Sequence, residues 1–222
     1  LFAADETAPR ARGWRSGDTL RLGSLGRLHP VKGYDVLIAA VAYLQAQGFR
    51  SPTSFEVAIA GEGAEREALQ AAAASAGVDC LRLEGFIDNP RSWLADLHGY
   101  LQPSRSEGLC IAAHEAMQAG LPIIASAVGE LPHSVVQGET GWVVPPADPR
   151  ALAAALRDLL ANPERLAGMG EAARERLFAR FGAEAFEAAG AAVLARLSVS
   201  AAGRAIGARP RPPRPPASGR RV

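Results

Sequence analysis

Stretches with the spacing of β-strands alternate along this chain with longer stretches that have the spacing of α-helices. Residues 19–25 alternate apolar and polar side chains, whereas residues 34–47 repeat apolar side chains at helical intervals. Further strand-like stretches lie at 55–60, 81–87, 100–102, 122–126 and 141–145, and further helical ones at 64–76, 92–97, 111–119, 150–160 and 163–197. The alternation predicts βαβ units, and therefore an α/β, Rossmann-like three-layer domain with a parallel sheet. Such sheets bind ligands beyond the carboxyl ends of their strands, so the loops that follow the strands are expected to carry the function.

The two ends of the 222-residue chain lack this alternation. Residues 1–18 have no periodicity and no initial Met, and we expect them to be a linker stub from a missing N-terminal domain. Residues 19–197 suffice for one domain with its own core. Residues 198–222 are rich in Arg, Pro, Ala and Gly, which bury too little apolar surface to offset ordering entropy, so we expect a disordered tail. Such a basic segment can bind SH3-like or phosphorylated partners, but a solvated tail is the simpler interpretation.

The composition excludes several classes of partner. A net charge of +1 indicates no nucleic-acid surface, and no apolar run approaches the roughly 20 residues of a membrane-spanning helix. The cysteines, Cys80 and Cys110, have neither metal-site spacing nor the number for a disulfide framework. We therefore expect a cytoplasmic protein without a bound metal ion.

The loop after the first strand places two cations, Arg27 and Lys32, between Gly26 and Gly33. Arginine offers a planar fork to phosphate oxygens, lysine offers a point charge, and the N-terminus of the following helix favours an anion as well. Taken alone, the loop is more typical of two solvated cations beside a turn. A second glycine turn at Gly61 is a weaker signal of the same kind.

The loop after the strand at 100–102 carries two carboxylates, Glu107 in the loop and Glu115 in the following helix. A carboxylate accepts two hydrogen bonds side by side, which suits the vicinal hydroxyls of a ribose or a hexose. We expect Ser104 or Ser106 to cap this helix. We also expect Glu115 to have a partner, because its neighbours are apolar and an unpaired buried carboxylate is costly.

These motifs occur in a fixed order: Leu-Gly-Arg-Leu-x-x-x-Lys-Gly at 25–33, Gly-Glu-Gly at 61–63, Gly-Phe-Ile at 85–87, and Pro-Ser-x-x-Glu-Gly…Glu-Ala-x-x-Ala-Gly-x-Pro at 103–122. Together they resemble the C-terminal, donor-binding domain of the retaining family 4 glycosyltransferases, also described as glycosyl transferases group 1. These are two-domain enzymes of GT-B fold, and the resemblance covers about 20–197, most of the chain.

The resemblance implies a role for each matching position. Arg27 and Lys32 would bind the diphosphate of a UDP-, GDP- or ADP-sugar and stabilise the leaving group, Glu107 would contact the hexose, and Glu115 the ribose. Arg27, Lys32 and Glu107 are thus the catalytic candidates. The other implied donor-binding positions are Gly26, Gly61, Phe86, Ile87, Gly108, Leu109, Cys110 and Ile111, and a core position fits Phe86 equally well. The two cations take the place of a metal ion, so no metal or cofactor is implied.

The resemblance also implies partners. The donor substrate would be a nucleoside diphosphate sugar, and the acceptor an unidentified sugar, lipid or small molecule bound by the missing N-terminal domain. The chain would then be the donor-binding half of a hexosyltransferase and inactive by itself. Peripheral membrane association of the full-length protein stays open beside a cytoplasmic location.

Two positions depart from the family pattern. Cys110 stands where the family usually has a small residue such as Gly, and His133 stands where it has an acid. We interpret His133, His29 and His114 as structural or solvated, and His98 belongs to no motif. The departures leave a non-catalytic nucleotide-binding or scaffolding module as the alternative function. Another GT-B enzyme, an epimerase or a phosphorylase, fits the spacing of 103–122 less well.

Overall fold

The computed structural model describes Phe2 and residues 9–206. Residues 1, 3–8 and 207–222 lie outside the described residues, and with them lie parts of the expected linker stub and of the expected tail. Within the described ranges, no helix combines the length and the apolar composition that a membrane crossing requires.

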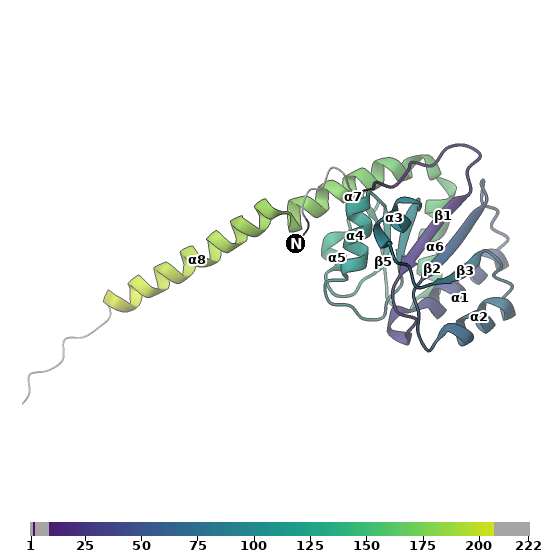
Figure 1. Ribbon diagram of the computed structural model, residues 1–222, viewed down its shortest axis with the longest axis horizontal. Coiled ribbons are helices and arrows are strands. Elements are labelled where there is room, and N and C mark those ends of the chain that lie inside the picture. Colours follow the sequence, from purple (N-terminus) through teal and green to yellow (C-terminus); the bar gives the residue numbers. More distant parts are fainter. Residues whose placement is uncertain (1, 3–8, 207–222) are drawn as a thin grey trace, which may run out of the picture.

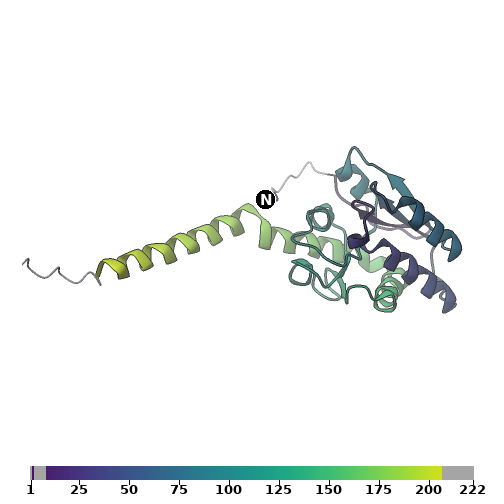
Figure 2. The same cartoon turned by 90° about the horizontal axis from the view of Figure 1, so that it is seen from below.

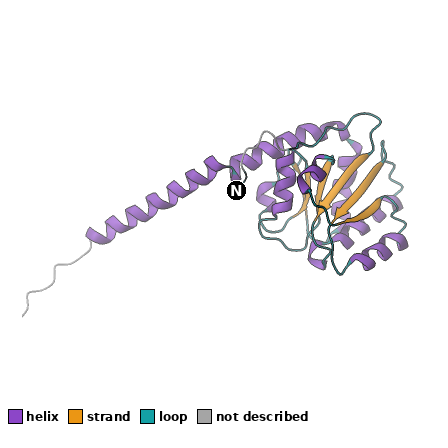
Figure 3. Cartoon of the chain, in the orientation of Figure 1, coloured by secondary structure: helices purple, strands orange, loops and turns teal. Residues whose placement is uncertain are grey.

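A parallel sheet forms the middle layer of the α/β body (Figures 1 and 3). Its described strands are β1 (Leu20–Leu25), β2 (Phe55–Ala60), β3 (Leu81–Gly85), β4 (Gly99–Gln102), β5 (Ile123–Ser126) and β6 (Gly141–Val144). Their order across the sheet is β3-β2-β1-β4-β5-β6, and every neighbouring pair is parallel. The strand order reverses between β1 and β4, which makes that crevice the topological switch point, where open α/β sheets bind ligands.

Helices cover both faces of the sheet, as the alternation predicts. One face is covered by α1 (Tyr34–Ala46), α2 (Arg66–Ser75) and α6 (Pro149–Ala161). The other is covered by α3 (Pro90–Ala95), α4 (Ile111–Ala119) and α5 (Leu131–Ser134), with α7 (Leu166–Phe181) packed against α4. The α/β, Rossmann-like prediction is confirmed.

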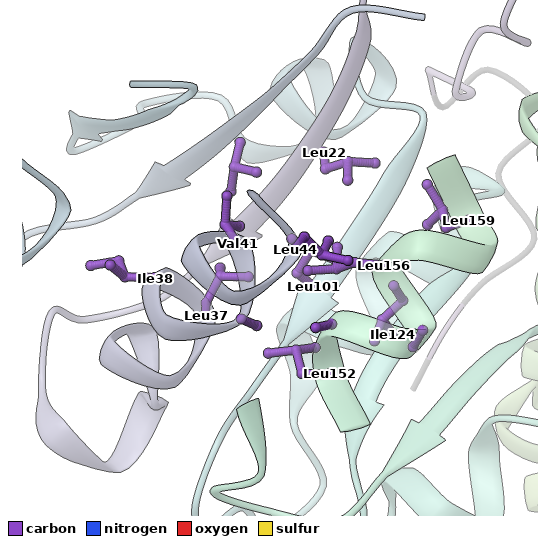
Figure 4. Close-up of a cluster of buried hydrophobic side chains, with 14 of the residues drawn as sticks. Leu22, Leu37, Ile38, Val41, Leu44, Leu101, Ile124, Leu152, Leu156 and Leu159 are labelled. Atoms are coloured by element: carbon purple, nitrogen blue, oxygen red, sulfur yellow. The ribbon is translucent and has the colours of Figure 1, made fainter. Parts of the chain in front are cut away.

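Each strand contributes alternate side chains to the two layers. Leu101 and Ile124 belong to the cluster under α1 and α6, where Leu37 and Leu156 lie in Figure 4. Tyr100, the neighbour of Leu101, belongs instead to the cluster under α3 and α4. Successive strand residues point to opposite faces, so a strand buried on both sides is mostly apolar.

The C-terminal helical region differs in detail from the expectation of helical structure over 163–197. It consists of the 3-10 turn η2 (Pro163–Arg165), α7 and α8 (Ala183–Ile206), and the chain turns at Gly182 between α7 and α8. Helix α8 extends away from the α/β body in both views (Figures 1 and 2). It continues to Ile206, so residues 198–206 are helical where we expected the tail to begin.

Two further elements are too short for a periodic sequence signal. They are the 3-10 turn η1 (Pro30–Lys32) and α5. The described part of the expected linker stub runs along the α3–α4 layer: the Ala11 amide donates to the Ala119 carbonyl at 2.7 Å, and the Arg12 amide to the Ala95 carbonyl at 3.2 Å.

Candidate functional site

The β1–α1 loop carries the two predicted phosphate-binding cations. Arg27 is exposed, and its side chain forms no hydrogen bond or ion pair within the described part of the chain. Lys32 lies at the end of η1, directly before α1. A side chain at Gly26 would come within 3.0 Å of the buried hydroxyl of Tyr34, so the loop passes close to the body of the domain here.

Lys32 and Glu107 meet across the switch point. Lys32 Nζ donates to Glu107 Oε1 at 2.7 Å, and the two side chains are only 20% and 10% exposed. Lys32 follows β1 and Glu107 follows β4, the strands between which the order reverses. Partial exclusion of water strengthens their attraction relative to that of a surface pair.

Lys32 is the only lysine among the 24 Lys and Arg residues of the sequence. A chain that otherwise uses arginine keeps a compact ammonium group at this one contact, where a planar guanidinium makes a different set of bonds. The presence of a single lysine is thus a second sequence signal for this site, in addition to the motif around it.

An ion pair that the sequence analysis missed joins the same two loops. Arg105 makes two bonds to Asp35, from Nη1 to Oδ1 at 2.7 Å and from Nη2 to Oδ2 at 2.6 Å, and its Nη1 also donates to the Pro30 carbonyl at 2.7 Å. The hydrogen bond from Arg105 lowers the pKa of Asp35 below its ordinary value. The backbones touch as well, since a Cβ at Gly33 would lie 2.1 Å from the Pro103 carbonyl oxygen.

The expected serine cap of α4 is wrong. Cys110 occupies the N-cap position and makes no side-chain capping bond, while Ser104 Oγ donates to Glu107 Oε1 at 2.7 Å. Cys110 has a left-handed backbone, with φ at +60°, that glycine adopts more readily. Burial raises the pKa of its thiol to about 12. A glycine, as in the family pattern, would therefore adopt this left-handed conformation without strain. The cysteine at position 110 adopts it with backbone strain.

His114 is a structural residue, in agreement with its sequence interpretation. Its buried ring lies between the Cys110 carbonyl, 3.0 Å from Nδ1, and the Ser134 hydroxyl, 2.8 Å from Nε2. Burial lowers the pKa of the imidazole, which keeps the ring neutral near neutral pH. His98 is likewise buried, and its Nδ1 accepts from the Arg21 amide at 3.0 Å.

The remaining predicted positions are spread along the same edge of the sheet. Gly61 is a packing position, because a Cβ there would lie 1.9 Å from the Gly26 carbonyl oxygen. Phe86 and Ile111 expose 74% and 60% of their surface, and Ile87 is half-buried. Gly108 is exposed and Leu109 is half-buried, both beyond the carboxyl end of β4.

Glu115 does not join the Lys32–Glu107 pair. It lines a separate small hollow beside α3, together with Pro9, Arg91 and Leu94. The expectation of a buried, partnered carboxylate is wrong: Glu115 is half-buried, and its side chain makes no ion pair or hydrogen bond among the described residues. It faces the edge of the helix layer rather than the core, so water can solvate it.

In the described part of the chain, no group of three or more His, Cys, Asp or Glu side chains is placed to hold a metal ion.

A parallel sheet with the order 3-2-1-4-5-6 and charged loops at its switch point defines a Rossmann-like α/β domain. The profile of the family "Glycosyl transferases group 1" matches residues 7–176. The chain belongs to this family.

Individual relatives agree with this assignment. The chain is 36% identical over 174 residues to a D-inositol 3-phosphate glycosyltransferase of Streptomyces coelicolor, a match that covers 75% of this chain and 38% of the relative. It thus spans less than half the length of the curated relatives that it matches.

Solved structures match the same fold. The C-terminal domain of a glycosyl transferase group 1 family protein from Francisella tularensis has a TM-score of 0.64 at 23% identity, covering 74% of this chain and 87% of that one. The structure therefore matches the C-terminal half of the GT-B architecture. HepE of Anabaena, solved with UDP and glucose, has a TM-score of 0.66 at 20% identity, covering 80% and 48%.

Proposed function

We propose that this chain is the donor-binding part of a retaining glycosyltransferase, which moves a hexose from a nucleoside diphosphate sugar to an acceptor. The observation that carries the proposal is the ion pair of Lys32 with Glu107 at the switch point, in which Lys32 comes from the loop that also carries the exposed Arg27. Family membership and the UDP complex of HepE support the same class of ligand.

Arg27 and Lys32 are proposed to bind the diphosphate. When the bond between the sugar carbon and the diphosphate breaks, negative charge accumulates on the leaving group, and fixed cations stabilise that charge. Arg27 has its whole fork available for phosphate oxygens. Lys32 donates one of its three N–H bonds to Glu107, which leaves two for the ligand.

Glu107 is proposed to accept hydrogen bonds from hydroxyls of the hexose. The backbone from Gly108 to Ile111 then lies beside the sugar and the phosphates. Phe86 is 74% exposed, which supports a position at the nucleotide base over a core role, and Ile87 lies next to it. Glu115, on α4, is the proposed contact of the ribose.

The acceptor is proposed to bind to a part of the full protein that this chain does not span, as the longer relatives suggest. Because transfer requires both substrates to be held against each other, this chain alone is expected to bind a nucleotide without transferring its sugar. The acceptor in turn is a sugar, a lipid or a small molecule.

Titration calorimetry tests the proposal with UDP, GDP and ADP and their glucose or mannose conjugates. The Arg27→Ala/Lys32→Ala double variant is expected to lose binding of every nucleotide that the wild type binds, since charge-assisted bonds contribute about 1.5–3 kcal/mol each. Arg50→Ala/Arg82→Ala is the control, because it also removes two exposed cations but away from this edge. Equal affinity in wild type and the Arg27/Lys32 variant contradicts the phosphate site.

The single lysine permits a direct spectroscopic test. Reductive methylation with ¹³C-formaldehyde labels Lys32 and the chain's amino terminus. Binding of the nucleotide is expected to shift the Lys32 methyl signal in the NMR spectrum and to leave the terminal signal in place. A shift confined to the terminus contradicts the assignment.

A further inference from the structure

Gln102 is a fully buried amide at the end of β4, two residues before Ser104. A buried amide is costly unless its donors and acceptor are satisfied. Gln102 Nε2 donates to Glu107 Oε1 at 3.0 Å and to Ser104 Oγ at 2.8 Å. Its Oε1 accepts from the hydroxyl of Tyr100 at 3.1 Å.

Tyr100 lies at the oxygen end of this amide. Its hydroxyl accepts from the Leu25 amide at 3.0 Å, so the buried phenol is itself fixed by the backbone of β1. Burial raises the pKa of Tyr100 well above its usual value, so the hydroxyl keeps its one proton, which the Leu25 carbonyl at 3.2 Å and Gln102 Oε1 at 3.1 Å can each accept. The Glu107 carboxylate only accepts, so the amide nitrogen of Gln102 faces Glu107 and the amide oxygen faces Tyr100.

Three donors then converge on a single oxygen of Glu107. Oε1 accepts from Lys32 Nζ at 2.7 Å, from Ser104 Oγ at 2.7 Å and from Gln102 Nε2 at 3.0 Å. The other oxygen, Oε2, takes none of these bonds. The neighbouring Cys110 thiol also interacts with this carboxylate. Each carboxylate oxygen has two lone pairs, so Oε2 keeps acceptor capacity for a ligand.

We infer that Gln102, itself fixed by Tyr100, is a positioning residue that holds the Glu107 carboxylate so that Oε2 accepts a hydroxyl of the donor sugar. The inference rests on the proposed function and deepens it. It assigns Gln102 to recognition of the sugar alone, because Arg27 and the remaining N–H bonds of Lys32 bind the diphosphate independently of it.

The sugar dependence of affinity provides the test. Calorimetry compares a nucleoside diphosphate with its sugar conjugate, using whichever of the UDP/UDP-glucose, GDP/GDP-mannose and ADP/ADP-glucose pairs the wild-type chain binds. In Gln102→Leu, affinity for the conjugate is expected to fall about tenfold, whereas affinity for the free diphosphate stays within about twofold. Damage to the fold lowers both affinities together, so the split between them separates positioning from a merely structural role.

Two further variants keep the test decisive. Gln102→Met preserves the unbranched shape of glutamine and replaces Gln102→Leu if the latter does not fold, as judged by circular dichroism. Gln70→Leu makes the same chemical change on the exposed surface of α2 and is expected to bind like wild type. Tyr100→Phe is expected to give a smaller loss of the same sugar-dependent kind.

The outcomes separate the two proposals. Unchanged conjugate binding in both Gln102 variants, with Glu107→Gln impaired, overturns the role of Gln102 and leaves the proposed function intact. A wild-type chain that binds none of the three pairs overturns the proposed function, and the positioning role falls with it. An equal loss for the diphosphate and the conjugate also overturns the positioning role.

Discussion

Arg105 holds Asp35 through both carboxylate oxygens, at 2.7 and 2.6 Å, and thereby ties the β4–α4 loop to the first turn of α1. The two residues come from opposite halves of the sheet. The contact fixes the distance between the loops that carry Lys32 and Glu107, so it contributes to the site without containing a ligand-binding group.

Asp35→Asn is expected to destabilise the chain modestly at neutral pH. The side chains are 52% and 36% exposed, so solvent screening limits the loss to about 0.5–1 kcal/mol. Because the pKa of Asp35 is lowered in the folded state, its contribution is full above the ordinary value of 3.8 and disappears as the pH falls through the lower folded value. Urea unfolding at about pH 7 and about pH 3 should show a larger difference between wild type and variant at the higher pH.

Gly33→Ala is expected to cost more than Gly48→Ala. Both glycines have similar left-handed φ values, +67° and +69°, but only Gly33 faces a backbone atom, the Pro103 carbonyl oxygen, which would lie 2.1 Å from an added Cβ. Gly48 has open space around it, so its substitution carries only the backbone strain of about 1–2 kcal/mol. Thermal unfolding of the two variants compares their stabilities. An equal loss of stability in both variants would show that the loops carrying Gly33 and Pro103 can move apart at no cost.

The Cys110 thiol is expected to resist thiol–disulfide exchange in the folded chain. A pKa of about 12 leaves almost no thiolate at neutral pH, and the thiolate is the reactive form. Reaction with Ellman's reagent in the Cys80→Ser variant isolates Cys110, and we expect it to react only after urea is added. Rapid labelling of the native variant contradicts the buried position.

Replacement of Cys110 by glycine should stabilise the backbone locally by about 1 kcal/mol, because φ at +60° is strained for a residue with a side chain. The loss of the buried side chain offsets part of this gain. Comparison with Cys110→Ala, which loses the thiol but keeps the strain, separates the two effects in urea unfolding. Glycine should be the more stable of the two.

Leu101→Ala is expected to destabilise the chain by about 2–5 kcal/mol, since Leu101 is fully buried in the layer under α1 and α6. Leu194→Ala makes the same change on α8, where the side chain is 66% exposed, and should change stability by about 0.5 kcal/mol or less. The midpoints of urea unfolding of the two variants test this difference in stability. Similar midpoints would place Leu101 outside a packed core.

The sequence predicted the parallel three-layer fold because periodicity reports which faces of an element are buried. It could not predict which loops touch. The pairing of Lys32 with Glu107 depends on the adjacency of β1 and β4, and strand order is set by packing between residues about 75 positions apart. The buried Tyr100–Gln102 hydrogen bond was missed for a related reason, since a polar residue at the end of an apolar strand has no periodic signature. Glu115 shows the opposite error, because apolar neighbours in sequence suggested burial that the rotation of α4 does not impose.

The reversal of strand order also divides the candidate site between two continuous pieces of chain. Residues 20–85 form the β1–β3 half of the sheet with Lys32, and residues 99–144 form the β4–β6 half with Glu107. During synthesis, the piece that contains Lys32 is made before the piece that contains Glu107. A chain split between β3 and β4 would form the Lys32–Glu107 ion pair only when its two fragments reassociate, so formation of this ion pair reports that the two halves of the sheet have assembled.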